Sequence, residues 1–93
     1  MATTICNAIR HRHVISFQYD GSIRRVEPHQ VGDDHDGDQT LSAWQLSGGS
    51  GVGWRDFHTA KMSAPTPTGE SFAGPRPGYN PNNKKMRRIL CGL

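Results

Sequence analysis

Apolar and polar residues alternate in several short runs of this chain, and alternation of this kind predicts half-buried β-strands. The clearest run covers residues 14–19, in which the odd-numbered positions are Ile15, Phe17 and Tyr19 and the residues between them are polar. The dipeptide Asp20-Gly21 follows, and Asp-Gly favours a tight hairpin turn. We therefore expect a first strand over 14–19 that turns directly into a second.

Three further strands are predicted by the same reasoning, at residues 22–31, 40–46 and 53–62. Pro28 interrupts the first of these, which predicts an edge, a bulge or a bend at that point. The strand at residues 40–46 offers Leu41, Leu46 and either Ala43 or Trp44 to the core. Polar residues 32–39 and the Gly/Ser-rich residues 47–51 are expected to be loops.

The two ends of the chain have different patterns. Residues 3–12 place Ile5, Ala8 and Ile9 on one helical face, which predicts a short helix. Residues 64–83 are rich in Pro, Gly, Thr and Asn, so an extended segment that wraps the rest is expected there. Residues 84–93 are basic and then apolar, which suits a final strand or a short helix.

Length and composition limit the architecture. The chain has 93 residues, 33% of them hydrophobic, with 11 Gly and 6 Pro, which suits one small turn-rich domain. We expect a mainly β fold, a short-stranded barrel, with a helix in 1–13, the barrel core in 14–63 and a wrapping tail in 64–93. The small size and low apolar content also favour a homodimer, with the C-terminal segment as its interface.

The charge is unevenly distributed. The formal net charge is +3, and the acidic residues Asp33, Asp34, Asp36 and Asp38 all lie in one loop. The remaining surface is therefore distinctly cationic, which favours an anionic partner without identifying it.

The cysteines and the termini bear on location. Cys6 and Cys91 lie near opposite ends of the chain, and the N-terminus lacks a basic segment followed by an apolar run. No stretch reaches membrane-spanning length. We expect reduced thiols, a cytoplasmic protein and no contact with a membrane.

Two kinds of catalytic chemistry find little support. Neither cysteine has the surroundings of an activated thiol, and the chain contains no Gly-x-Ser-x-Gly motif. Asp33, Asp34, His35 and Asp36 could ligate a metal, but a solvated hairpin tip is the favoured interpretation. A metal-dependent nuclease at this loop is thus the least favoured alternative, and we predict no catalytic residue, no metal and no cofactor.

A group of basic and aromatic residues carries the preferred hypothesis. Arginine binds phosphate through paired hydrogen bonds, and a neighbouring aromatic ring can stack a base. The opposing interpretation, in which Trp44 fills the core and the cations are simply solvated, has about equal weight. The group consists of Arg24, Arg25, Trp44, Arg55, His58 and Lys61.

From Ile5 to about Met62 the sequence resembles the WYL domain, a bacterial ligand-sensing module with an SH3-like (Sm-like) barrel. The resemblance rests on several short segments in the family's order, followed by a tail similar to that of stand-alone members. These segments are Val14 to Tyr19, Arg24-Arg25-Val26-Glu27-Pro28, Trp44-Gln45-Leu46, Arg55-Asp56-Phe57-His58, Lys61-Met62, and Phe72 with Arg76 to Pro81.

The resemblance implies a sensor of nucleic acid or nucleotides in a bacterial regulatory or defence setting, acting with a transcription regulator. Two residues depart from the family pattern: Gln45 replaces an aromatic residue, and His58 replaces an arginine, which would make the charge of the pocket depend on pH. A protein–protein interaction adaptor is the main alternative. The ligand contacts that the resemblance implies are Tyr19, Arg24, Trp44, Arg55, His58 and Lys61.

Overall fold

The computed structural model describes residues 2–93, which form one α-helix, one short 3-10 helix and a six-stranded antiparallel sheet. The strand order is β4-β3-β2-β1-β5, and β6 pairs with β2 beside this path, so the sheet is not closed within the described residues. The predicted mainly β fold with one N-terminal helix is confirmed. The elements are α1 (Ala2–His11), β1 (His13–Tyr19), β2 (Ser22–Asp34), β3 (Gln39–Ser47), β4 (Gly53–His58), the 3-10 helix η1 (Thr59–Lys61), β5 (Ser63–Ser71) and β6 (Met86–Gly92).

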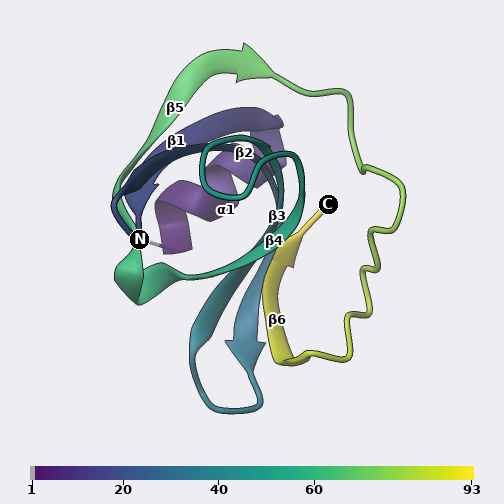
Figure 1. The fold of residues 1–93 in the computed structure, drawn as a ribbon. Helices are drawn as coiled ribbons and strands as arrows, with labels where there is room; N and C mark the ends of the chain where they lie inside the picture. Colours follow the sequence, from purple (N-terminus) through teal and green to yellow (C-terminus); the bar gives the residue numbers. More distant parts are fainter. Residues whose placement is uncertain (1) are drawn as a thin grey trace.

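Strand β2 is the centre of the sheet (Figure 1). Its first part pairs with β1 and its last part with β6, while β3 follows it along most of its length. The register with β3 shifts between Pro28 and Gln30, because Pro28 has no N–H for the ladder and a bulge accommodates it. The predicted bulge at Pro28 is confirmed, although the strand continues to Asp34 and the loop after it is shorter than predicted.

The turn between β1 and β2 forms as predicted. Asp20 and Gly21 have φ angles of +48° and +80°, and a two-residue hairpin turn of type I′ needs positive φ at both positions. Ile15 and Phe17 of β1 are buried, so the alternation in this strand correctly assigned the core face.

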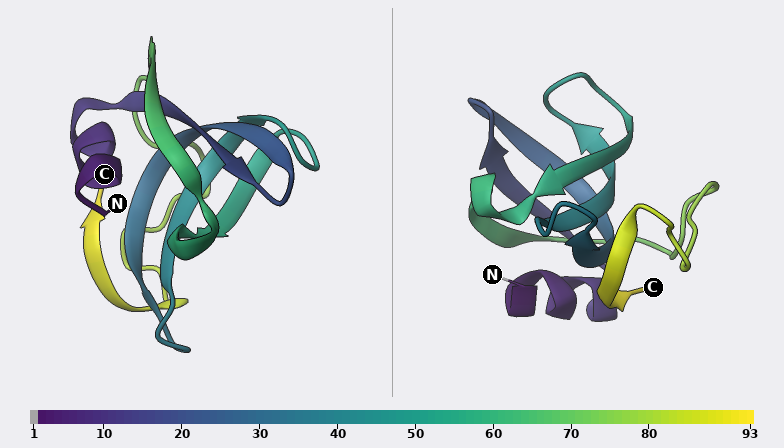
Figure 2. Two further views of the ribbon diagram at one scale, coloured as in Figure 1. Left: turned by 90° about the vertical axis from the view of Figure 1, so that its left-hand side faces the viewer. Right: turned by 90° about the horizontal axis from the view of Figure 1, so that it is seen from below.

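Helix α1 covers one side of the curved sheet and contacts β1, β2, β5 and β6 (Figure 2). Ile5, Ala8 and Ile9 are buried in the core as predicted, and each large aliphatic side chain contributes about 1.5–3 kcal/mol to folding. The helix is 10 residues long. No helix within residues 2–93 has the length and apolar character needed to cross a bilayer.

The C-terminal third contains two further strands. Strand β5 pairs with β1 where the sequence predicted an extended wrapping segment, and strand β6, which pairs with β2, lies where a final strand or a short helix was predicted. Both strands satisfy backbone groups that would otherwise line open edges of β1 and β2. Between these strands, residues 72–85 run outside the sheet, along the right-hand side of Figure 1, and we call this segment the strap.

The cysteines also differ from the prediction. Cys6 of α1 and Cys91 of β6 form a disulfide, with their Cα atoms 5.9 Å apart, so the expectation of two reduced thiols is wrong for this structure. The cause is topological. Helix α1 packs on β2, and β6 pairs with the end of β2, which brings the two ends of the chain together.

Candidate functional site

The structure divides the predicted ligand-binding residues between the two faces of the sheet. In β3 and β4 the register pairs Ala43 with Arg55 and Trp44 with Trp54, and paired residues share a face. Ala43 is fully buried, so Arg55 lies on the core side of its strand. Trp44 therefore lies on the outer face, away from the guanidinium of Arg55.

Tyr19 and Arg24 do come together, at one end of the core. The Arg24 guanidinium lies 5.6 Å from the centroid of the Tyr19 ring and 5.8 Å from that of Phe57. It donates hydrogen bonds to Gln45 Oε1 (3.0 Å) and to the Tyr19 carbonyl (3.3 Å). Gln45 is fully buried and donates in turn to the carbonyls of Gly48 (2.8 Å) and Gly51 (2.6 Å).

Arg55 reaches the same glycine loop from β4. Its guanidinium donates to Ser50 Oγ (2.9 Å) and to the Gly51 carbonyl (3.3 Å). Gly48 has a φ of +95°, and a Cβ there would collide with the Ile23 carbonyl oxygen, so glycine is required at this position, while the Arg24 guanidinium fills the space beside Gly49. We call the group formed by Tyr19, Arg24, Arg55 and the loop 48–51 the arginine mouth.

The charges of the arginine mouth are not neutralised by acids. Within residues 2–93, Arg24 and Arg55 donate only to neutral oxygens, and neither has a carboxylate within ion-pair distance. By contrast, Arg25 pairs with Glu70 at 2.8 Å. Two half-buried guanidinium groups without a carboxylate form an environment that favours an anion.

His58 and Lys61 lie elsewhere. The His58 ring is 3.9 Å from a carboxylate oxygen of Asp34 and 3.9 Å from one of Asp38, so it faces the β2–β3 hairpin. Its backbone N–H donates to the Tyr19 hydroxyl at 3.1 Å, which is its one hydrogen bond to the mouth in the described structure. Lys61 is exposed on η1, not on the predicted fourth strand.

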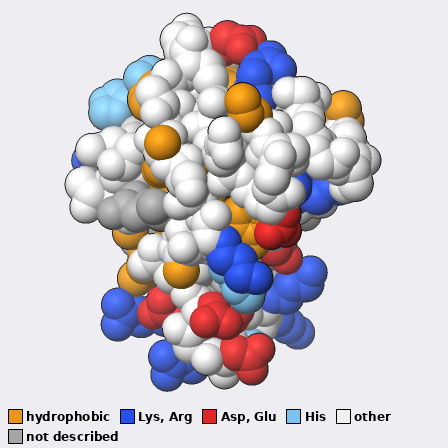
Figure 3. Space-filling view, turned by 60° about the vertical axis from the view of Figure 1, so that its left-hand side comes forward, with side chains coloured by type: hydrophobic (Ala, Val, Ile, Leu, Met, Phe, Trp, Pro, Cys, Tyr) orange, Lys and Arg blue, Asp and Glu red, His pale blue; other side chains and the backbone are white. Residues whose placement is uncertain are grey.

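The acidic loop is a hairpin tip, as the favoured interpretation held. Asp34 Oδ1 accepts the backbone N–H groups of Asp38 and Asp36, both at 2.9 Å, and these hydrogen bonds lower the pKa of Asp34. His35 turns away and contacts the Lys84 carbonyl at 2.8 Å. Figure 3 shows acidic and basic side chains interspersed at this end of the molecule, not a continuous basic surface.

The acids that were candidate metal ligands are therefore not gathered as the sequence suggested. Within the described residues, Asp34, Asp38 and His58 lie close together instead, with one ligand atom from each within 4.8 Å of the others. The sequence predicts His58 only as a ligand contact, because it lies 20 positions after Asp38 and strand pairing alone brings the two together.

Trp44 is covered by the strap. The Arg76 guanidinium lies 5.4 Å from the Trp44 ring centroid and forms a two-point ion pair with Glu27 at 2.7 and 2.8 Å. The Glu27 side chain is only 6% exposed, and its hydrogen bond to Arg76 raises the pKa of Arg76. Sequence reasoning missed this pair, because strand alternation places Glu27 on the face opposite the core residue Val26, where a solvated acid is expected.

His29 holds the strap at a second point. It is fully buried, and its Nε2 accepts the backbone N–H of Arg76 at 3.1 Å. Its Nδ1 lies 2.8 Å from the Glu27 carbonyl, so Nδ1 must carry the proton of the neutral ring. Burial lowers the pKa of His29, which keeps the ring neutral.

Comparisons with known proteins add no relative from which a function could be transferred. No protein-family model matches the chain, and neither the curated proteins nor the solved structures give a match. The function is therefore inferred from the residues of the chain itself.

Proposed function

We propose that this protein is a non-enzymatic module that binds a phosphate-bearing ligand, a nucleic acid or a nucleotide, at the arginine mouth. The observation that carries the proposal is the convergence of Arg24 and Arg55 on one glycine loop without a carboxylate partner. Guanidinium groups bind phosphate oxygens through paired, charge-assisted hydrogen bonds, and the three glycines of the loop let a ligand approach the backbone.

The resemblance to the WYL domain supports the same proposal from the sequence. We propose an SH3-like barrel that senses its ligand in a bacterial regulatory or defence setting, in company with a transcription regulator. Of the implied contacts, the proposal keeps Tyr19, Arg24 and Arg55, and it leaves out Trp44 and His58, which have partners on the outer face. Lys61 is an exposed cation that a long ligand would meet outside the mouth.

A cytoplasmic location remains a prediction, and the state of Cys6 and Cys91 tests it. A reducing compartment keeps cysteines as free thiols, whereas an oxidising compartment preserves disulfides. Alkylation of the protein in freshly lysed source cells, followed by mass spectrometry, distinguishes the two. Two alkylated cysteines agree with a cytoplasmic location, and a protected pair contradicts it.

The arginine mouth is tested with a matched pair of variants, Arg55→Met and Arg87→Met. Both remove one arginine charge, but Arg87 is exposed on β6, outside the mouth. The probes are pyrophosphate and a fluorescently labelled single-stranded oligonucleotide, titrated at two salt concentrations. We expect Arg55→Met to weaken binding by about 1.5–3 kcal/mol, the value of a hydrogen bond to a charged group, and Arg87→Met to have little effect.

Binding of the oligonucleotide should also weaken as the salt concentration rises, because binding to the protein releases cations that are condensed on the phosphates, and added salt opposes that release. Equal loss in the two variants would mean that only net charge matters and would refute the assignment of the site. If the folded wild-type protein binds neither probe, the proposal is wrong, and the protein–protein adaptor becomes the function to test.

A further inference from the structure

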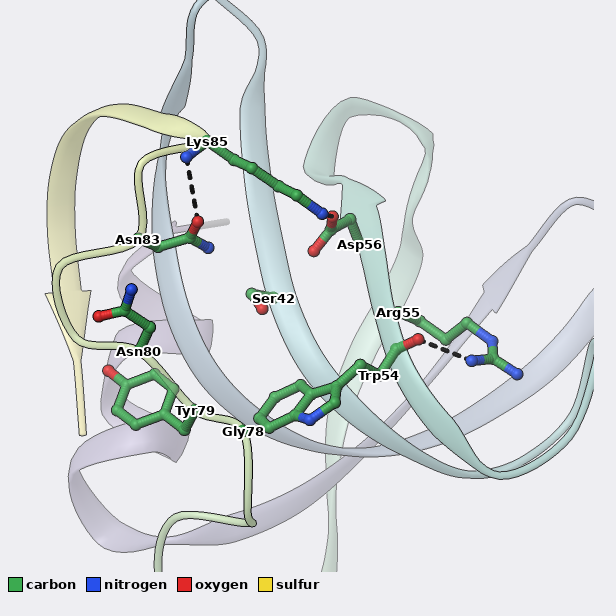
Figure 4. Close-up of a pocket in the computed structure, with 9 residues that line it drawn as sticks. All are labelled: Ser42, Trp54, Arg55, Asp56, Gly78, Tyr79, Asn80, Asn83 and Lys85. Carbon is green, nitrogen blue, oxygen red and sulfur yellow. Dashed lines mark hydrogen bonds and ion pairs between the residues drawn. The ribbon is translucent and has the colours of Figure 1, made fainter.

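A second site lies between the outer face of the sheet and the strap. Figure 4 shows a cavity bounded by Ser42 of β3, by Trp54 and Asp56 of β4, and by strap residues that include Tyr79. Its volume is about 360 Å³, within the range of small-molecule sites. Arg55 contributes to its rim, but the guanidinium points away from the cavity toward the glycine loop.

Two aromatic rings form one wall of the cavity. The planes of Trp54 and Tyr79 differ by 23°, and their centroids are 6.4 Å apart. Each ring is fixed at its polar end, because Trp54 Nε1 donates to the Pro77 carbonyl at 3.0 Å and the Tyr79 hydroxyl donates to the Leu93 carbonyl at 3.2 Å. The rings are thus held in place before a ligand arrives, which lowers the cost of ordering them on binding.

Hydrogen-bond donors outnumber acceptors around the rest of the cavity. The side-chain oxygens of Asn80 and Asn83 already accept the backbone N–H groups of Asn82 (2.9 Å) and Lys85 (3.0 Å). Their Nδ2 groups therefore remain as donors. The Lys85 ammonium crosses the rim to Asp56, 3.6 Å away, and both side chains are well exposed, so a ligand can displace this contact.

Asp56 supplies the carboxylate acceptor among these donors. An aromatic wall suits a flat ring, and a carboxylate beside several N–H donors suits a ring edge that carries an N–H next to a carbonyl group. We propose that this cavity binds a keto nucleobase, the class of guanine and uracil. The ring packs against Trp54, a carbonyl group accepts a hydrogen bond from Asn83, and the N–H next to that carbonyl group donates to Asp56.

This inference does not rest on the arginine mouth, because the base needs no phosphate. The test uses the oxidised 93-residue protein, labelled with ¹⁵N and titrated with uridine, with guanosine and, for comparison, with adenosine and methyl glucoside. We expect uridine and guanosine to shift the Trp54 indole N–H signal and the backbone signals of residues 79–85. The Trp44 indole signal and the amide signals of residues 48–51 should change less.

The matched variants are Asp56→Ala and Asp36→Ala, which each remove one exposed carboxylate. Asp36 lies at the hairpin tip and does not line the cavity. We expect the dissociation constant for uridine to rise at least about fivefold in Asp56→Ala and to stay unchanged in Asp36→Ala. Trp54→Leu should abolish the shifts, with the amide spectrum serving to show that the variant is folded.

Three results would overturn the inference. The nucleosides could leave all the cavity signals unchanged at millimolar concentration. Adenosine or methyl glucoside could bind as well as uridine. Asp56→Ala could bind uridine as well as the wild-type protein does. Each of these would leave the arginine mouth untouched, because pyrophosphate titration tests that site separately.

Discussion

Reduction of the Cys6–Cys91 disulfide should remove a large part of the stability of this protein. The bridge joins residues 85 positions apart, which is nearly the whole chain. In the chain-entropy model, a closed loop of that length lowers the entropy of the unfolded state by an amount worth about 4.6 kcal/mol at 25 °C. Measured bridges more often give about 2–4 kcal/mol, against a total stability of about 5–15 kcal/mol for a small domain.

The assay is equilibrium unfolding in urea, followed by tryptophan fluorescence, for the oxidised protein, the reduced protein and Cys6→Ala/Cys91→Ala. With a slope of about 1 kcal/mol per molar urea for a chain of this size, a loss of about 2 kcal/mol lowers the midpoint by about 2 M, and a larger loss lowers it further. The reduced protein and the double variant should agree with each other. A midpoint that moves by less than about 0.3 M in both would refute the reasoning, since the bridge would then not constrain the unfolded chain.

Three further predictions concern the contacts that hold the strap and the mouth. Because burial lowers the pKa of His29, the unfolded chain takes up a proton on this side chain before the folded chain does as the pH falls below about 6.5. The free energy of unfolding should therefore be full above that pH and should drop below it by at most about 1.4 kcal/mol per pH unit. Urea unfolding from pH 8 to 5 measures this, and a flat profile would contradict it. Arg76→Met leaves the buried Glu27 carboxylate without a partner and should cost about 3 kcal/mol, with faster amide exchange in the strap; unchanged exchange would mean that other contacts hold it. Tyr19→Phe removes the acceptor of the His58 N–H and should cost about 1 kcal/mol in thermal unfolding, whereas an equal melting temperature would show that water replaces the hydroxyl.

The local features of this fold were predictable because local sequence determines them. The alternation of Ile15, Phe17 and Tyr19 assigned the core face of β1, and Asp20-Gly21 specified the turn after it. Pro28 marked the bulge in β2 because a missing N–H has the same consequence in any sheet. For the candidate site, the same parity could have separated Trp44 from Arg55, had it been applied across the paired strands β3 and β4.

The long-range contacts were not predictable from such patterns. The disulfide needs Cys6 and Cys91 to meet, and the strap needs Arg76 to reach Glu27, which is 49 positions away. Neither contact leaves a periodic signal, because each depends on how the strands pair and not on neighbouring residues. Composition indicated only that additional stabilising contacts exist, because a chain of this length with 33% hydrophobic residues buries a small core.

The strap also decides which surface of this protein is free for a ligand. A base could stack on Trp44 only if the exposed face of the indole ring were open. The Arg76 guanidinium lies over this ring and is held there by its ion pair with the buried Glu27. A base that competed for Trp44 would have to break the ion pair between Arg76 and Glu27, and the Glu27 carboxylate would then be left buried without a compensating charge. A base that enters the cavity beside Trp54 breaks only the exposed contact between Lys85 and Asp56. Aromatic recognition by this chain is therefore expected at Trp54, and phosphate recognition at the arginine mouth.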